Sequence, residues 1–289
     1  QFSAVGRGGM FGMLVDTHGA IELDRVHRFL NDWERAASLQ LRRRDPAVAD
    51  TYAREGRLHG GTVDQIERAA VSAWWRHRKA GESTLLMAPS NETVDRLNQA
   101  AQRRRIAAGE LVDGECFVLP NGVRLHVGDE IATRHNDRTI ETDRHEMVRN
   151  RNTWTITAIN DDWTITARGS TGTVVLPAEY LCDHVELAYA VTAMGAQGRT
   201  VDHAITVIDA VTDVRNLYVP MTRGRESNHA YLAVEGENTA VDVFARYLTN
   251  DWIDLPAHQR AQELWAPTGL EPDFRTPATS RDDDFGIEL

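Results

Sequence analysis

An arginine pattern in the last third of the sequence is suited to binding phosphate. The stretch "YVPMTRGRE" (218–226) places Arg223 and Arg225 directly after an apolar run. A guanidinium stays charged and grips phosphate oxygens through two parallel N–H groups. In phosphoryl transfer such an arginine contributes about 10³-fold or more to the rate. The structural alternatives are a solvent-facing position for Arg223 and, for Arg225, an ion pair with Glu226 or another acidic neighbour.

A polar turn upstream offers a second place for phosphate. Gln197, Gly198 and Thr200 lie in "GAQGRTVD", between two apolar runs. Backbone N–H groups and a hydroxyl can bind a nucleic-acid phosphate here without net charge. The net charge of −11 excludes binding through an overall basic surface, so any nucleic-acid binding must be local. We expect Asp202 to order this turn by accepting its hydrogen bonds; the alternative is an ordinary glycine turn.

Other kinds of site are excluded by what the sequence lacks. Lys79 is the only lysine, and it does not follow a glycine-rich loop, so the chain contains no P-loop. Cys116 and Cys182 stand alone and no two histidines have metal-ligand spacing, so we expect neither a metal site nor a disulfide. No apolar run is long enough to span a membrane. A cytoplasmic protein without membrane association is therefore expected, and the start at Gln1 suggests a piece of a longer chain.

The elements that must position these residues alternate between strands and helices. Apolar residues at helical spacing predict a helix over 63–77 capped by Thr62. A strand over 84–88 is followed by the capping pair Ser90-Asn91 and a helix that ends at Gly109. Strand, cap and helix form the half-unit of a parallel α/β sheet.

The middle of the sequence has a different periodicity. From about residue 113 to 184, turn residues separate segments that alternate between apolar and polar. Trp154 and Trp163 begin two similar segments on either side of an Asn-Asp-Asp turn, which predicts a hairpin with both tryptophans facing inward. We therefore expect a compact antiparallel β-barrel inserted in the α/β domain. An exposed tryptophan would instead favour a role in gripping a nucleic-acid strand.

The α/β pattern then returns. We expect strands over 187–192, 203–209 and 229–235, a helix over 214–223 opened by Asp213, and a helix over 238–248 capped near Asn238. Pro220 lies within the helix over 214–223 and should bend it. The proline-bearing acidic end is expected to be disordered.

Several motifs together resemble superfamily 1 helicases of the RecD-like, 5′-to-3′ branch. "AYAVTAMGAQGRTVDHAI" and "NLYVPMTRGRESNHAYL" resemble the last two motifs of that family, and "QFSAVGRGGMFG" is similar to the end of its third motif. "VHRFLNDWERAASLQLRRRD", and "TLLMAPSNETVDRLN" with its Asn98, are most similar to the helicase part of actinobacterial conjugative relaxases of the TrwC or MobF class. The resemblance covers roughly residues 1–250.

The resemblance implies an α/β fold with two RecA-like lobes and ATP between them. Residues 1–80 would be the end of the first lobe and connecting helices, and 81–112 with 185–250 the second lobe. Residues 113–184 would be an inserted SH3-like β-barrel, and 251–289 a largely disordered acidic extension. A first lobe outside this sequence would hold the P-loop and Mg²⁺, and a relaxase domain could precede it.

The resemblance also implies roles for individual residues. Arg223, Gln1 and Arg28 would be catalytic, with Arg223 as the arginine finger and the other two reaching the γ-phosphate. ATP would be bound by Gln1, Arg28, Gly198, Arg223 and Arg225. Single-stranded DNA would be bound by Ser90, Asn91, Gln197 and Thr200. No residue would bind a resident metal ion.

Two departures from the family pattern affect these expectations. Met194 and Gly195 stand where members commonly have a histidine and a basic residue, which would weaken one link between nucleotide and strand. Pro220 replaces a small helix former. We expect the C-terminal motor half of an ATP-dependent 5′-to-3′ DNA helicase, inactive alone; the alternative is a non-catalytic helicase remnant that binds DNA or protein. The coding frame upstream of residue 1 would distinguish these.

Overall fold

The computed structural model describes residues 28–111, 114–209 and 215–249, all of which belong to one compact unit of the chain. The expectations for Gln1, Asp213 and the extension at 251–289 lie outside the described residues. In these three ranges, no helix has both the length and the apolar character that spanning a bilayer requires.

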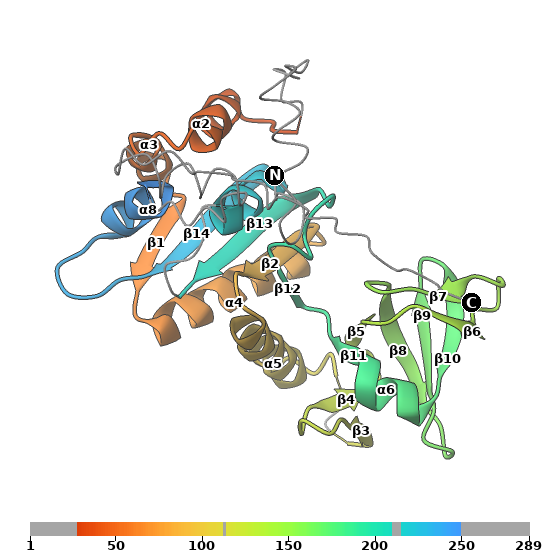
Figure 1. Cartoon of the computed structure of the whole chain (residues 1–289). Coiled ribbons are helices and arrows are strands. Elements are labelled where there is room, and N and C mark those ends of the chain that lie inside the picture. Colours follow the sequence, from red (N-terminus) through yellow and green to blue (C-terminus); the bar gives the residue numbers. More distant parts are fainter. Residues whose placement is uncertain (1–27, 112–113, 210–214, 250–289) are drawn as a thin grey trace, which may run out of the picture. The chain divides into compact units, whose positions relative to one another are not determined.

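A five-stranded parallel sheet forms the centre of an α/β fold, as the sequence predicts (Figure 1). Its order is β1-β14-β13-β2-β12, and every neighbouring pair runs parallel. The strands are β1 (Leu58–Gly61), β14 (Gly224–Ala233), β13 (Val201–Ile208), β2 (Thr84–Ala88) and β12 (Ala190–Thr192). β13 is almost wholly buried, which is typical of a strand covered on both faces.

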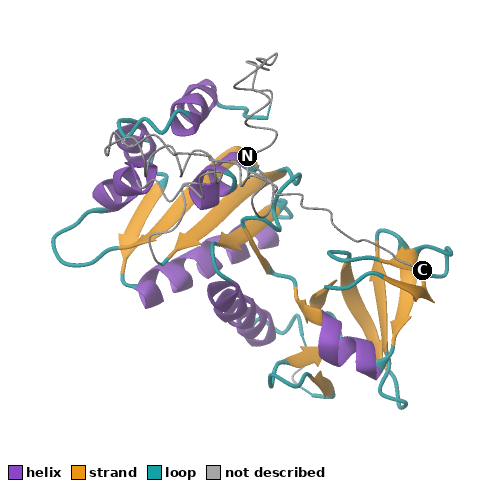
Figure 2. Cartoon of the chain, in the orientation of Figure 1, coloured by secondary structure: helices purple, strands orange, loops and turns teal. Residues whose placement is uncertain are grey.

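Helices cover both faces of the parallel sheet (Figure 2). One face packs against α4 (Val63–Lys79) and α5 (Asn91–Ala107). The other packs against α2 (Asp32–Arg42), α3 (Val48–Arg54), α7 (Arg215–Tyr218), the 3₁₀ turn η1 (Pro220–Thr222) and α8 (Ala240–Thr249). Successive side chains of β14 point to opposite faces of the sheet, so Tyr231 belongs to the core with α4 and Leu232 to the core with α8.

Local signals determine where α4 and α5 begin and end, and both predicted helices are confirmed. The Thr62 hydroxyl accepts a hydrogen bond from the backbone N–H of Gln65, whose side chain accepts one from the backbone N–H of Thr62. The Ser90 hydroxyl caps α5 by accepting from the backbone N–H of Thr93. Gly109 follows α5 with φ of 72°, a conformation that favours glycine.

The part of the chain between α5 and β12 forms antiparallel sheets. The larger has the order β10-β9-β8-β5-β11, and β3-β4 and β6-β7 form two small ones. The elements are β3 (Cys116–Val118), β4 (Arg124–His126), β5 (Glu130–Thr133), β6 (Asp137–Glu141), β7 (Met147–Val148), β8 (Thr153–Ile159), β9 (Ile165–Gly169), β10 (Gly172–Leu176), α6 (Ala178–His184) and β11 (Val185–Leu187). Trp154 and Ile156 are buried on one face of β8, as the alternation predicts.

The prediction that Trp163 faces inward is wrong. Its side chain is 63% exposed, whereas that of Trp154 is 2% exposed. Trp163 lies in the turn before β9, with φ of 64°, and its backbone N–H donates to the backbone carbonyl of Asn160. The hairpin is present, but Ile165 pairs with Ile159, so the two similar segments do not superpose in register.

The domain boundaries predicted after residues 80 and 184 do not coincide with the limits of the two main sheets. β1 and α4 lie before residue 80, yet β1 pairs with β14 and α4 packs on the same sheet as α5. The predicted strand over 187–192 is divided, because β11 pairs with β5 in the antiparallel sheet and β12 pairs with β2 in the parallel one. The chain therefore passes between the sheets at 188–189, not at 184–185.

Two predicted helices differ at their ends. In place of one helix over 214–223, α7 ends at Tyr218 and η1 begins at Pro220, because proline has no N–H to continue the α-helix. α8 begins at Ala240 and not at 238, and its cap is Thr239, next to Asn238: the Thr239 hydroxyl accepts from the backbone N–H of Asp242, 3.2 Å away.

Candidate functional site

The starts of β13 and β14 bring three predicted residues together. Thr200 precedes β13 and Arg223 precedes β14, and the backbone N–H of Val201 donates to the carbonyl of Arg223 over 3.1 Å. Arg28 reaches the same place from far upstream: its Nε donates to the Thr200 hydroxyl over 3.2 Å, and its Nη1 donates to the carbonyl of Thr222. Side chains from three distant segments therefore converge on one edge of the parallel sheet.

Arg223 is held by its own turn instead of facing solvent. Its side chain is 7% exposed, its Nε donates to the carbonyl of Val219 over 2.9 Å, and its Nη2 donates to the Thr222 hydroxyl over 3.1 Å. Burial, and then the neighbouring charge of Arg28, lower the pKa of Arg223 to about 10. No carboxylate in the described ranges forms an ion pair with Arg28 or Arg223, so two close cations share one site without a counter-charge.

Arg225 points to a different partner. Its Nη2 lies 2.5 Å from Oδ1 of Asp202, which is the acidic-neighbour alternative expected from the sequence. Asp202 also accepts from the backbone N–H and hydroxyl of Ser83, and these hydrogen bonds, followed by Arg225, lower its pKa to about 2. The prediction that Asp202 orders the turn at 197–200 is therefore wrong, because both its oxygens bind groups elsewhere.

The turn at Gln197 opens on a pocket of about 310 Å³. Gly198 has φ of 85°, so the turn favours glycine there. Asn91 at the start of α5, Gln197 and the basic side chains of Arg134 and Arg151 line the pocket. Arg134 is paired with Glu186, 2.6 Å away.

Ser90 and Asn98 have structural hydrogen bonds within the fold. The Ser90 hydroxyl caps α5 and lies 2.8 Å from the hydroxyl of Thr93. Asn98 is buried; its amide donates to the carbonyl of Leu187 and accepts from the backbone N–H of Ala190. Of the predicted DNA contacts, Asn91 and Gln197 share the pocket, while Thr200 lies with Arg28.

Arg151 is a candidate that sequence reasoning missed. A Cβ atom added at Gly195 would lie 2.8 Å from Nη1 of Arg151, so this guanidinium occupies the space beside the glycine. Gly195 is one of the two positions where the resembled family commonly has another residue type. The sequence contains no signal for this contact, because residue 151 lies in the turn before β8 of the antiparallel sheet and residue 195 in the turn after β12 of the parallel one.

A histidine pair joins β1 to β14. Nε2 of His59 lies 3.0 Å from Nδ1 of His229, and Nη1 of Arg57 lies 3.1 Å from Nε2 of His229. Because arginine can only donate, Nε2 of His229 accepts and the ring is neutral. Burial, and then Arg57 and His59, lower the pKa of His229 to about 3.

The neutral His229 should make the fold sensitive to acid. As pH falls below about 6.5 the unfolded chain binds a proton at this ring, whereas the folded chain does not until pH approaches about 3. The free energy of unfolding should therefore fall on acidification, by up to about 1.4 kcal/mol per pH unit from this ring. Urea unfolding between about pH 7 and pH 5 should show a shallower dependence in His229→Asn. The matched control His145→Asn removes an exposed histidine and should keep the wild-type slope; an unchanged slope in His229→Asn would contradict the neutral ring.

Comparisons with known proteins find one family model and several relatives. A family model described as an AAA domain matches residues 1–63. The conjugal transfer protein TraA of Agrobacterium fabrum is 29% identical over 241 residues, covering 80% of this chain and 21% of TraA. The multifunctional conjugation protein TraI of Escherichia coli is 34% identical over 171 residues, covering 58% of this chain and 9% of TraI. The chain thus spans about a fifth of the TraA length.

A shorter relative is covered more fully. The uncharacterized protein Rv2311 of Mycobacterium tuberculosis is 33% identical over 140 residues, which cover 45% of this chain and 79% of that protein. Among solved structures, Bacteroides Pif1 bound to ssDNA is similar over 84% of this chain and 55% of that one, with a TM-score of 0.49 and 14% identity.

Proposed function

Because the chain belongs to the superfamily 1 helicases related to conjugative relaxases, we propose that it is the C-terminal motor half of an ATP-dependent 5′-to-3′ DNA helicase. Its partners would be single-stranded DNA, an N-terminal lobe that carries the P-loop, and a relaxase domain in the same longer protein. The parallel sheet and its helices would form the second RecA-like lobe, to which β1 and α4 also belong. The antiparallel sheets of residues 113–184 would be the SH3-like insertion.

The observation that carries the nucleotide part of this proposal is the pair Arg28 and Arg223. Two guanidinium groups held near each other and partly out of water destabilise one another unless an anion lies between them. Neither has a carboxylate partner in the part of the chain that the structure describes. A phosphate supplies the missing negative charge and accepts charge-assisted hydrogen bonds from both. These residues fit a polyphosphate better than they fit a protein side chain.

The proposed substrate is ATP with Mg²⁺, and this chain would supply only one wall of its site. Arg28 and Arg223 would contact the phosphate groups, with Thr200 positioning Arg28 through their hydrogen bond. Turning the guanidinium of Arg223 toward an anion would break its hydrogen bonds to the carbonyl of Val219 and to the Thr222 hydroxyl, which bonds to the anion would have to replace. The roles of Gln1, Gly198 and Arg225 remain predictions from the resemblance, and Arg225 would have to leave Asp202 to reach ATP.

The pocket beside Gln197 is proposed to bind the DNA backbone. Asn91 and Gln197 offer polar groups, and Arg151 offers a charge that forms no ion pair within the described ranges, since Glu186 of the same lining pairs with Arg134. This arrangement permits local strand binding by a chain of net charge −11. Arg151 would also supply, from the antiparallel sheets, a basic group beside Gly195.

Binding of a short oligothymidylate by the 289-residue chain tests this part of the proposal. We expect Arg151→Ala to weaken binding about tenfold at moderate salt, because a hydrogen bond to a charged group is lost. The slope of log K against log salt should become shallower by about 0.7, the value for one contact with a single-stranded phosphate. Fluorescence anisotropy at several salt concentrations measures both quantities.

Arg149→Ala is the matched control. Arg149 lies two positions away, pairs with Glu146 at 3.5 Å and does not line the pocket, so its removal should leave affinity and slope unchanged. Equal weakening by the two substitutions would indicate a diffuse electrostatic effect and would remove the pocket from the proposal.

A further inference from the structure

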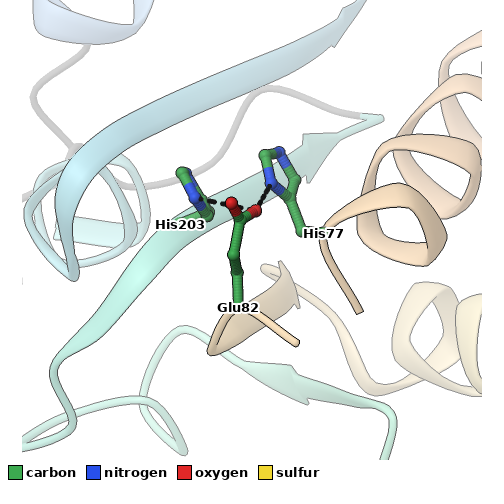
Figure 3. Close-up of side chains that lie close together, drawn as sticks. All are labelled: His77, Glu82 and His203. Carbon is green, nitrogen blue, oxygen red and sulfur yellow. Dashed lines mark hydrogen bonds and ion pairs between the residues drawn. The ribbon is translucent and has the colours of Figure 1, made fainter. Parts of the chain in front are cut away.

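Three side chains outside the proposed nucleotide and DNA sites meet at the edge of the parallel sheet (Figure 3). His77 lies in the last turn of α4, Glu82 in the loop before β2, and His203 on β13. Oε2 of Glu82 is 2.6 Å from Nδ1 of His77 and 3.2 Å from Nε2 of His203. The two imidazole rings stack with their centroids 3.8 Å apart. Sequence spacing gave no sign of this cluster, because parallel pairing of distant segments creates it.

The orientation of His203 is the second observation that points to a ligand. Its side chain is buried, and Nδ1 lies 2.8 Å from the hydroxyl of Ser227 on β14. That contact fixes the ring and leaves Nε2 facing the carboxylates of Glu82 and, at 3.6 Å, Glu226. Within the described part of the chain, this buried Nε2 faces the two carboxylates without making a hydrogen bond of good geometry to either. A buried, oriented imidazole nitrogen in that position requires an explanation.

We propose that His77, Glu82 and His203 bind one divalent transition-metal ion, with Zn²⁺ as the best match. One ligand atom from each residue lies within 4.8 Å of the other two. Zn²⁺ bonds to nitrogen and oxygen are about 2.0–2.2 Å long, so ligand atoms around a tetrahedral ion are roughly 3.3–3.5 Å apart. Because the two rings are stacked and Oε2 of Glu82 lies only 2.6 Å from Nδ1 of His77, the side chains of His77 and Glu82 would have to rotate for the three ligand atoms to surround one ion.

The type of ligand decides the class of ion. Two imidazoles and one carboxylate suit zinc and its first-row neighbours, whereas Mg²⁺ and Ca²⁺ prefer oxygen ligands throughout. The Ser227 hydroxyl beside Nδ1 of His203 has the role of an outer partner that orients a metal-binding histidine. Glu226 or water would complete the coordination.

The bound ion would join three elements of the fold. His77 lies in the last turn of α4, Glu82 precedes β2, and His203 lies on β13, where it begins the pairing with β2 and is opposite Ser227 of β14. Asp202 and Arg225, the neighbours of His203 and Glu226 in sequence, are themselves ion-paired. Metal binding should therefore stabilise the sheet edge on which the candidate phosphate site lies.

Isothermal titration calorimetry of the untagged 289-residue chain, stripped with a chelator, tests this proposal with Zn²⁺ as the probe. We expect one ion per chain, and at least a tenfold loss of affinity in His77→Gln and in Glu82→Gln. Ser227→Ala should weaken binding about tenfold by releasing His203. Co²⁺ in place of Zn²⁺ should give the visible absorption of a tetrahedral site in the wild type and lose it in His77→Gln.

The matched control is His145→Gln. His145 is exposed and lies 3.5 Å from Glu141, so it reproduces a histidine–carboxylate pair outside the cluster. It should keep wild-type affinity, and Zn²⁺ should raise the melting temperature of this variant and of the wild type but not of Glu82→Gln. His77 and Glu82 are both partly exposed, so their substitution is not expected to unfold the chain, and a loss of Zn²⁺ affinity can be assigned to the site. Wild-type affinity in His77→Gln and Glu82→Gln, or no binding at all, would overturn the proposal without affecting the helicase assignment.

Discussion

Arg223→Ala is expected to lower DNA-stimulated ATP hydrolysis by about 10³-fold or more, in a polypeptide where a lobe carrying Gly-x-x-x-x-Gly-Lys-Thr precedes residue 1. The reason is electrostatic. A guanidinium delivered to the transferring phosphoryl group stabilises charge that develops in the transition state, and alanine leaves that charge exposed to water. Steady-state turnover with saturating single-stranded DNA measures the effect.

Arg223→Lys distinguishes charge from geometry. Lysine keeps a positive charge but offers a single ammonium in place of the planar fork, and it cannot reproduce the bonds of Arg223 to Val219 and Thr222 together. We expect it to recover only a small part of the lost rate. The melting temperature of each variant should be measured alongside, because Arg223 is buried and its loss also removes contacts within the turn.

Arg246→Ala is the control for this experiment. Arg246 is an exposed arginine on α8 whose contact is with the side chain of Asn238, away from the start of β14. It should leave turnover within the error of the wild type. If Arg223→Ala also kept wild-type turnover, the arginine-finger role would be refuted and the alternative, a binding module without catalytic function, would be favoured.

Elements with local signals could be predicted from the sequence. α4 and α5 begin at Thr62 and Ser90 because their side chains satisfy N–H groups that the first helical turn leaves free. β8 and β9 form a hairpin because apolar and polar residues alternate around a turn. The parallel sheet followed from the order of strands and helices.

Features that depend on pairing between distant segments could not be predicted. Trp163 is exposed because the hairpin turn includes it, and a sequence repeat does not specify register. Only two residues separate β11 from β12, so the single apolar run predicted as one strand contributes to two different sheets. Arg151 reaches Gly195, and His77 reaches His203, only because the fold brings these distant positions together.

The candidate phosphate site was predicted by residue type but not by conformation. The motif resemblance selected Arg28, Thr200 and Arg223, and the structure places these three together. It did not predict that Arg223 would bond to its own turn, which depends on the break that Pro220 introduces between α7 and η1. Whether these residues bind nucleotide remains a prediction that the Arg223 variants test.

The largest loss of stability is expected from Arg105→Ala, which should lower the free energy of unfolding by about 3–5 kcal/mol. Arg105 lies on α5 and is 6% exposed. Its Nη1 donates to the carbonyl of Gly128 and to the hydroxyl of Tyr189, each over 2.8 Å, and its Nε lies 3.1 Å from Oε2 of Glu110. One guanidinium thus joins α5 to the turn before β5 and to the connection before β12.

The expected loss of stability is large because the polar groups that Arg105 leaves behind are buried away from water. The hydroxyl of Tyr189 donates to Oδ1 of Asp129, and Asp129 is fully buried, with its other oxygen accepting from Gln102 over 2.7 Å. Burial and the Asp129 charge raise the pKa of Tyr189, so the hydroxyl stays protonated and remains a donor. Removing the cation leaves a buried carboxylate that is stabilised only by neutral hydrogen bonds.

Arg104→Ala is the matched control, one position earlier on the same helix. Arg104 is exposed and lies over the ring of Trp75 at 5.5 Å, so its loss should cost about 1 kcal/mol or less. Urea unfolding gives both values, and a double-mutant cycle with Tyr189→Phe should show coupling of about 0.5–3 kcal/mol, since the two residues share one network. Equal and small losses in Arg104→Ala and Arg105→Ala would mean that water reaches Asp129, and that the two sheets are joined mainly by apolar packing.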